Sequence, residues 1–583
     1  MSDALSLTTK LLPGLTMLYG EQAPACANRI AQLADNYRDT QWPTPRPLWT
    51  EHDAILITYA DQVLNSDTPP LTVLHQFLAE FHLQAVFSTL HILPFFPSSS
   101  DDGFAVVDYR SVEPAFGSWR DLLVLHGSFD LMVDLVLNHC SSRHHWFQDY
   151  LQNRPPGCRY FIEGDPTDDY SQVTRPRETP LLSCFQTARG DRHVWTTFSR
   201  DQVDLDWANP DVLLEMLEVL LLYVRRGARI IRLDAIGYLW KQRGTNCIHR
   251  PQVHLLVKLM RALLDFVAPG TLLLTETNVP HMENVRYFGE GDEAHIVYQF
   301  SLPPLLLEAY ISGDAQPLRT WLAGLSPPLP GTTYLNFTAS HDGIGLRPLE
   351  GLLSARRISS LVEAVCAAGG RVSCRQSTDG SSTPYELNAS YFSAVNSLPN
   401  LSPVLRVRRF LASQAIMLAL QGIPAVYFHS LLGSLNDVAG ANQSGRARSI
   451  NRRKFALDEV RSLLNDTEST GQRVFSGYCT MLRTRTNQPA FHPAAHQEVL
   501  HFTEPSVIAF VRTSLDDRQH ILVIANVGPS SVSIQLPAPF TRADANELLW
   551  LGAEWQTPDS LRLSPAAVVW LATGTWQVDA SRS

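Results

Sequence analysis

The eight cysteines of this chain are scattered, and no two of them have the Cys-x-x-Cys spacing of a zinc site or a redox dithiol. No uncharged apolar run is long enough to span a bilayer. The first residues also lack the basic segment and apolar core of a signal peptide. These absences predict a cytoplasmic protein with reduced thiols and no membrane contact.

Positive charge is not in excess either. The net charge is −10, which argues against nucleic acid as the main partner. With 45% hydrophobic and 18% charged residues, the composition is that of an ordinary globular protein. A chain of 583 residues is too long for one hydrophobic core, so two or three domains are expected.

The first 50 residues or so are polar and look helical, and they end in the proline-rich segment 42–47. After them, short apolar runs alternate with segments of helical periodicity. Two such helical segments are 212–226 and 251–267. Eight strands alternating with helices predict an α/β protein with a (β/α)8 TIM barrel. The predicted strands are residues 54–59, 85–93, 131–137, 228–233, 272–275, 295–300, 333–337 and 424–428.

Two connections in this barrel are too long for plain crossovers, and long loops inside a compact domain are usually functional. After about residue 487 the pattern changes to short strands separated by turns, which predicts an antiparallel C-terminal β domain. The predicted C-terminal strands are 499–503, 507–513, 520–527, 532–536 and 568–571. The predicted division is an N-terminal helical extension (1–50), a catalytic barrel (51–139 and 207–486), an inserted B domain (140–206), a second, B′-like insertion (343–403) and the C-terminal β domain (487–583).

Three acidic residues stand at or beyond the ends of predicted strands. Asp234 and Glu276 follow two consecutive apolar runs, and Asp342 follows a third. The C-terminal ends of barrel strands form the rim where such folds place their chemistry. Two carboxylates facing each other across a sugar can break a glycosidic bond. Each acid alone is more often a helix cap or a solvated charge, but together, each at its own strand end, they predict a catalytic site.

The motifs around these acids resemble the four signature regions of the alpha-amylase superfamily. Further motifs resemble its sucrose phosphorylase branch, whose members move a glucosyl unit between an acceptor and inorganic phosphate with retention. The signature regions are Asp134–His139, Arg232–Asp234, Glu276 and His341–Asp342. The branch motifs are Ile57–Asp61, His91–Pro97, Asp101–Phe104 and Asp234–Tyr238.

The resemblance and the residue chemistry agree on roles for the three acids. Asp234 is the expected nucleophile, because a nearby guanidinium such as Arg232 keeps a carboxylate ionised and oriented. Glu276, among leucines and threonines, is the expected general acid and base, since desolvation raises a carboxyl pKa. Asp342 is expected to stabilise the oxocarbenium-like state.

Further residues are expected to bind the sugar and phosphate. A lone histidine is more often a hydrogen-bonded core residue, but in this set His139 and His341 are expected to bind the sugar. The resemblance implies that Asp101 holds its far hydroxyls, that Phe104 covers its face and that Tyr238 lies near the cleaved bond. In the basic stretch 445–454, Arg452 is expected to bind phosphate; without the resemblance, this stretch would be interpreted as a solvated loop.

The acceptor is left open by the sequence. Asn278 stands where sucrose phosphorylases usually have histidine, and the stretches 337–349 and 383–388 resemble glucosylglycerate phosphorylases. Those enzymes act on 2-O-α-glucosylglycerate, whose carboxylate needs a cationic partner; the sequence does not choose among Arg375, Arg446 and Arg448.

Several alternatives remain at this stage. They are a glucosylglycerol, sucrose or sucrose 6-phosphate phosphorylase, a hydrolase or transglucosidase, and a non-catalytic partner protein. In many amylases the asparagine of the Asn138-His139 motif helps to bind calcium, whereas the sucrose phosphorylase branch generally lacks that site. We therefore expect no metal and no other cofactor; the expected partners are a small glucoside and inorganic phosphate.

Overall fold

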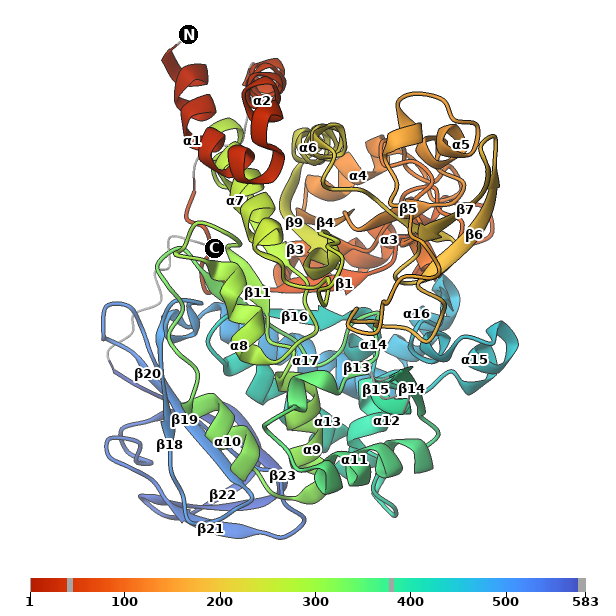
Figure 1. Ribbon diagram of the computed structural model, residues 1–583. Coiled ribbons are helices and arrows are strands. Elements are labelled where there is room, and N and C mark those ends of the chain that lie inside the picture. The colour runs from red at the N-terminus through yellow and green to blue at the C-terminus, as the bar shows by residue number, and fades with distance from the viewer. Residues whose placement is uncertain (1, 39–45, 377–381, 575–583) are drawn as a thin grey trace.

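Eight parallel strands close into a barrel at the centre of the molecule (Figure 1). The computed structural model describes residues 2–38, 46–376 and 382–574. The strands follow one another around the barrel in chain order, and the last pairs with the first. They are β1 (Ile55–Thr58), β3 (Thr89–Ile92), β4 (Asp130–Val136), β9 (Ala228–Asp234), β10 (Leu272–Thr275), β11 (Ile296–Tyr298), β12 (Thr333–Asn336) and β16 (Ile423–Tyr427). The predicted (β/α)8 barrel is confirmed.

Each of the eight predicted apolar runs overlaps one barrel strand, with one substantial shift in bounds. The second run was expected to be extended from residue 85, but β3 begins only at Thr89. Before it, His82 has a left-handed φ of 53°, and Leu83–Ala85 forms a 3-10 turn. The apolar side chains of that turn are part of a connection, so hydrophobicity alone overestimated the strand.

Helices surround the barrel strands (Figure 1). Pro210 opens α6 after Asn209, whose side chain accepts a hydrogen bond from the Asp211 N–H at 2.9 Å and so caps the start of the helix. The longer helices are α3 (Pro70–Glu80), α4 (Trp119–His126), α6 (Pro210–Arg225), α7 (Pro251–Val267), α9 (Leu302–Ser312), α10 (Gln316–Ala323), α13 (Pro403–Ala419), α16 (Leu457–Asn465) and α17 (Thr470–Thr486). Shorter helices are α8 (His281–Asn284), α14 (Phe428–Leu431) and α15 (Val438–Ser444).

Two antiparallel helices precede the barrel. They are α1 (Ser2–Tyr19) and α2 (Ala23–Arg38), which pack on α7 and α6 outside the barrel (Figure 1). Their buried residues, such as Leu11, Leu15 and Ile30, are continuous with the main hydrophobic core. Most of the proline-rich segment 42–47 lies outside the described residues.

The two long connections carry small sheets of their own. The first, between β4 and β9, contains β5 (His139–Ser141), α5 (His145–Leu151), β6 (Leu182–Thr187), β7 (Gly190–Trp195) and β8 (Gln202–Asp204). The second, between β12 and β16, contains β13 (Ile344–Gly345), α11 (Ala355–Ala367), β14 (Arg371–Gln376), β15 (Ser382–Asn388) and α12 (Tyr391–Val395). Both begin at the C-terminal ends of barrel strands. Their division into separate domains stays a prediction.

An antiparallel sheet forms the C-terminal part of the chain, as predicted. Its strands are β18 (His496–Leu500), β19 (Val507–Thr513), β20 (His520–Asn526), β21 (Val532–Gln535), β22 (Asn546–Thr557) and β23 (Ser560–Thr573). The sequence did not predict β22, because most of its length is partly exposed and lacks an alternating buried face. It also predicted only the end of β23, which contains Pro565. Among the described residues, no helix is long and apolar enough to cross a membrane.

Two fully buried arginines stabilise the junction between the barrel and this sheet. Arg485 of α17 donates to the carbonyl oxygens of Leu418 at 2.9 Å and Glu51 at 2.6 Å. Arg512 of β19 donates to the carbonyl oxygen of Ala419 at 2.7 Å. Both side chains therefore satisfy backbone acceptors that would otherwise be buried without a partner.

Replacement of Arg512 by methionine should lower the free energy of unfolding by roughly 2–4 kcal/mol, because several buried carbonyl oxygens lose their donor. The matched control is Arg518→Met, which alters a side chain that is 76% exposed and should change stability by less than about 0.5 kcal/mol. Chemical denaturation followed by circular dichroism measures both. Equal stability of the two variants would contradict a structural role for Arg512.

Candidate active site

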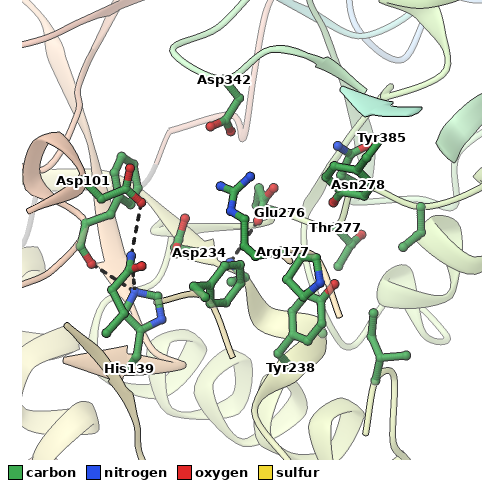
Figure 2. A pocket seen from close by; sticks show the side chains of 18 of the residues that line it. Asp101, His139, Arg177, Asp234, Tyr238, Glu276, Thr277, Asn278, Asp342 and Tyr385 are labelled. Atoms are coloured by element: carbon green, nitrogen blue, oxygen red, sulfur yellow. Dashed lines mark hydrogen bonds between the residues drawn. The ribbon is translucent and has the colours of Figure 1, made fainter. Parts of the chain in front are cut away.

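A pocket opens at the C-terminal rim of the barrel and collects most of the predicted residues (Figure 2). Eight of the ten line it: Asp101, Phe104, His139, Asp234, Tyr238, Glu276, His341 and Asp342. Arg232 and Arg452 are buried and do not line it. The first long connection supplies Pro176, Arg177, Phe198 and Gln202, and the second supplies Tyr385. The structure therefore brings these residues together at the rim, as the strand ends predicted.

Asp234 is held by a chain of buried charges. In a strand, residues two apart face the same side, so Arg232 and Asp234 of β9 point together. The Arg232 Nη1 donates to Asp234 Oδ1 at 2.8 Å and also pairs closely with Asp134 of the neighbouring β4. His91 of β3 hydrogen-bonds the other Asp134 oxygen at 2.7 Å. Three adjacent strands thus fix the orientation of the Asp234 carboxylate.

Glu276 follows β10 directly and has a different environment. Its Oε2 accepts a hydrogen bond from the Ala235 N–H at 2.9 Å. Ala235 has a φ of 48°, a left-handed conformation that a non-glycine residue rarely adopts. Such local strain is tolerated mainly at functional sites. No ion pair within 4.0 Å joins Glu276 to a cation in the described part of the chain.

These environments distinguish the two carboxyl groups. Burial raises the pKa of Glu276 and the pKa of Asp234; Arg232 opposes the rise at both, while the charge of Glu276 adds to it at Asp234. Two carboxyls in one pocket titrate as a pair. Because only Asp234 has an ion-paired guanidinium, the pair's remaining negative charge is expected on Asp234 and its proton on Glu276.

Asp342 is ionised and paired with Arg448. Burial raises its pKa, but the charges of Arg448 and Arg452 outweigh that effect and hold the pKa below its usual range. Arg448 also makes a bidentate pair with Glu386, with hydrogen bonds of 3.0 and 2.6 Å. The Asp342 carboxylate is therefore an acceptor for hydroxyl groups at neutral pH.

The remaining predicted sugar contacts form one wall of the pocket. Phe104 stacks on His341 with ring centroids 4.8 Å apart and an interplanar angle of 5°. Gln202 donates to Asp101 at 3.2 Å and lies 3.2 Å from the His139 Nε2 (Figure 2). Burial lowers the pKa of His341 to about 3 and also lowers that of His139, so both imidazoles are neutral hydrogen-bonding groups.

Arg452 lies behind this wall. Its guanidinium donates to the Asp102 carboxylate at 2.5 Å and to the His341 carbonyl oxygen at 2.7 Å. The side chain is 5% exposed and is absent from the pocket lining. The predicted contact between Arg452 and phosphate therefore has no direct counterpart in this arrangement and stays a prediction.

The three arginines that the sequence suggested for binding the acceptor carboxylate have different environments in the structure. Arg375 pairs with Glu350 at 2.8 Å, and Arg446 lies 3.8 Å from Asp102; neither lines the pocket. Arg448 does line it, but it is already paired with two carboxylates.

Arg177 lines the pocket and was missed by the sequence analysis. Its only sequence signal is the Arg175-Pro176-Arg177 stretch in a long loop, and periodicity cannot place loop residues in space.

Asn278, flagged as a departure from sucrose phosphorylases, also lines the pocket. Its Oδ1 is buried without a hydrogen-bond partner in the described residues. A Cβ added at Gly345 would lie 2.4 Å from this oxygen, so the glycine is needed to accommodate Asn278. Asn278 therefore packs tightly against Gly345 at the edge of the pocket.

A lysine occupies the oxygen cluster around Asn138. The Lys241 ammonium contacts Asn138 Oδ1 at 2.5 Å, Asp204 Oδ2 at 2.8 Å and the Tyr238 carbonyl oxygen at 2.5 Å. These oxygens already have a cation, and a divalent ion would have to displace it. Within the described ranges, no group of three or more His, Cys, Asp or Glu residues could hold a metal.

Comparisons with known proteins agree on one family. A family model described as alpha amylase, catalytic domain, matches residues 76–320. The glucosylglycerate phosphorylase of Allomeiothermus silvanus is 47% identical over 532 residues, which cover 90% of this chain and 94% of that protein. That of Spirochaeta thermophila is 45% identical over 574 residues, covering 96% and 97%.

A solved structure extends this agreement to the fold. Sucrose 6F-phosphate phosphorylase from Thermoanaerobacter thermosaccharolyticum matches with a TM-score of 0.71 at 26% identity, covering 82% of this chain and 94% of that chain. Identity to the two glucosylglycerate phosphorylases is clearly higher. The chain belongs to the alpha-amylase family and groups there with the glucosylglycerate phosphorylases.

Proposed function

We propose that this protein is a retaining phosphorylase that transfers the α-glucosyl unit of 2-O-α-glucosylglycerate to inorganic phosphate. The products are α-glucose 1-phosphate and glycerate. The observation that carries the chemical part is the environment of the two acids: Asp234 is ion-paired to Arg232, whereas Glu276 has no such partner. The acceptor is supported by 45–47% identity to glucosylglycerate phosphorylases over most of the chain.

The first half-reaction breaks the glycosidic bond. Asp234 attacks the anomeric carbon, the bond to the glycerate oxygen breaks, and Glu276 gives its proton to that oxygen. Asp342 stabilises the positive charge that develops on the ring. His139, His341 and Asp101 bind the sugar hydroxyls, and Phe104 covers the ring. The result is a glucosyl ester of Asp234 and free glycerate.

In the second half-reaction phosphate replaces glycerate. Glu276, now a carboxylate, acts as a base, and a phosphate oxygen attacks the anomeric carbon while the bond to Asp234 breaks. Two inversions give net retention. Tyr238 and Tyr385, which line the pocket away from Asp101 and His139 (Figure 2), would donate hydrogen bonds from their hydroxyl groups to the phosphate.

Hydrolysis or transfer to another acceptor is the competing function, because water could attack the same intermediate. The fold alone does not decide between them. The test offers glucosylglycerate, glucosylglycerol, sucrose and sucrose 6-phosphate in phosphate buffer and measures glucose 1-phosphate. Release from glucosylglycerate with the highest kcat/KM supports the proposal. Free glucose as the main product would contradict phosphorolysis, and preference for another glucoside would contradict the acceptor.

Replacement of Asp234 by asparagine should reduce turnover by about 10⁴-fold or more, because no glucosyl ester can form. The variant should keep its fold, since the amide has nearly the same shape and can still accept a hydrogen bond from Arg232. Steady-state kinetics with glucosylglycerate and phosphate measure the loss. Turnover within about 100-fold of wild type would exclude Asp234 as the nucleophile.

Replacement of Glu276 by glutamine should reveal its protonation state. The raised pKa of Glu276 means that wild-type cleavage of glucosylglycerate is lost as pH rises through that pKa, whereas protonation of Asp234 limits cleavage on the acid side. An activated donor such as α-glucosyl fluoride needs no proton, so formation of the glucosyl ester from it should survive in the variant and show no alkaline decline. Presteady-state kinetics across pH measure both. An equal loss with both donors would refute the acid role.

A further inference from the structure

The pocket is acidic, yet the proposed leaving group is an anion. Asp101, Asp234, Glu276 and Asp342 all line it. In 2-O-α-glucosylglycerate the carboxylate is attached to the carbon that bears the glycosidic oxygen. That carboxylate must therefore lie beside Glu276, close to other negative charges. Such an anion binds only if a cation faces it from the acceptor side.

Arg448 does not meet this requirement, although it lines the pocket. Both Glu386 oxygens accept hydrogen bonds from it, and it also pairs with Asp342. Glu386 is 1% exposed, so removing its partner would leave a buried charge. The guanidinium of Arg448 is thus neutralised by the protein itself.

Arg177 is the remaining guanidinium in the pocket lining. No hydrogen bond or ion pair joins its side chain to any residue that the structure describes. The preceding Pro176 is buried and also lines the pocket, which anchors the loop at this point. Figure 2 shows the Arg177 side chain among those that line the pocket, together with Glu276 and Tyr238.

Arg177 lines the pocket together with Tyr238 and Tyr385, which lie on the side away from Asp101 and His139 (Figure 2). Burial raises the pKa of Tyr385 and that of Tyr238, and the positive charge of Arg177 opposes the rise at both hydroxyls. Asn278, with its unpartnered Oδ1, lines the same pocket. A guanidinium beside two tyrosine hydroxyl groups fits a small molecule that carries both a hydroxyl group and a carboxylate, as glycerate does.

We propose that Arg177 is the specificity-determining residue that binds the acceptor carboxylate and so selects glycerate over the neutral glycerol. This role rests on the proposed function. It replaces the three arginines suggested by the sequence with a residue from the first long connection. The alternative is that Arg177 is a solvated loop residue whose position in the pocket has no consequence for the choice of acceptor.

The test measures how one glucosyl-enzyme partitions between two acceptors. The donor is α-glucosyl fluoride. Glucose 1-phosphate is unsuitable as the donor, because it releases phosphate, which enters the same space as glycerate and would compete with it. Glycerate and glycerol are offered together, and the ratio of the two glucosides is measured for wild type and Arg177→Gln. This ratio depends only on steps after the fluoride has left.

In Arg177→Gln the preference for glycerate over glycerol should fall by at least about 10-fold, the effect of one charge-assisted hydrogen bond. Fluoride release should change by less than about 3-fold, and Arg177→Lys should recover part of the preference because it retains the charge. Arg375→Gln is the matched control: it removes an arginine of the second long connection that pairs with Glu350 outside the pocket, and its ratio should equal that of wild type.

The possible outcomes distinguish the proposed function from the proposed role of Arg177. A wild-type enzyme that transfers no glucosyl unit to glycerate would overturn the proposed function, and the role of Arg177 with it. Wild-type transfer to glycerate with an unchanged ratio in Arg177→Gln would overturn the role of Arg177 alone. A variant that loses fluoride release as much as transfer to glycerate would show a general effect on the pocket and would also overturn a selective role.

Discussion

The buried ion pair between Arg232 and Asp234 is the interaction on which the site depends. Asp134 and His91 extend it across three adjacent barrel strands, so the orientation of Asp234 is set by the sheet and not by a loop. A guanidinium between two carboxylates is stable only when all three groups are paired. The same cation favours the charged form of Asp234, and the proposed division of roles between Asp234 and Glu276 rests on it.

The barrel and its acids were predictable because each signal is local. A short apolar run indicates a strand, and Asp234 and Glu276 stand directly after two such runs. Contacts between loops carry no such signal. Arg177, which lines the pocket, and Arg448, which pairs with Asp342, belong to segments whose positions depend on the whole fold. For the same reason the sequence did not predict that Arg452 donates to Asp102 and to the His341 carbonyl oxygen.

Charge compensation inside an acidic pocket determines which molecules it can accept. The protein neutralises Asp342 with Arg448 and leaves Glu276 without a cation. Lys241 similarly neutralises the oxygens around Asn138, which leaves no obvious place for a divalent ion there. Of the two arginines that line this pocket, Arg177 is the one with no ion pair to a described residue, which suits a reaction whose leaving group and incoming group are both anions.

The residue that forms the covalent intermediate can be identified by trapping that intermediate. A 2-fluoro glucosyl fluoride forms the ester quickly and releases it slowly, so the labelled protein can be digested and its peptides analysed by mass spectrometry. We expect one glucosyl label per chain, on the carboxylate of Asp234. A label on Glu276 or Asp342, or full turnover without any labelled peptide, would contradict it.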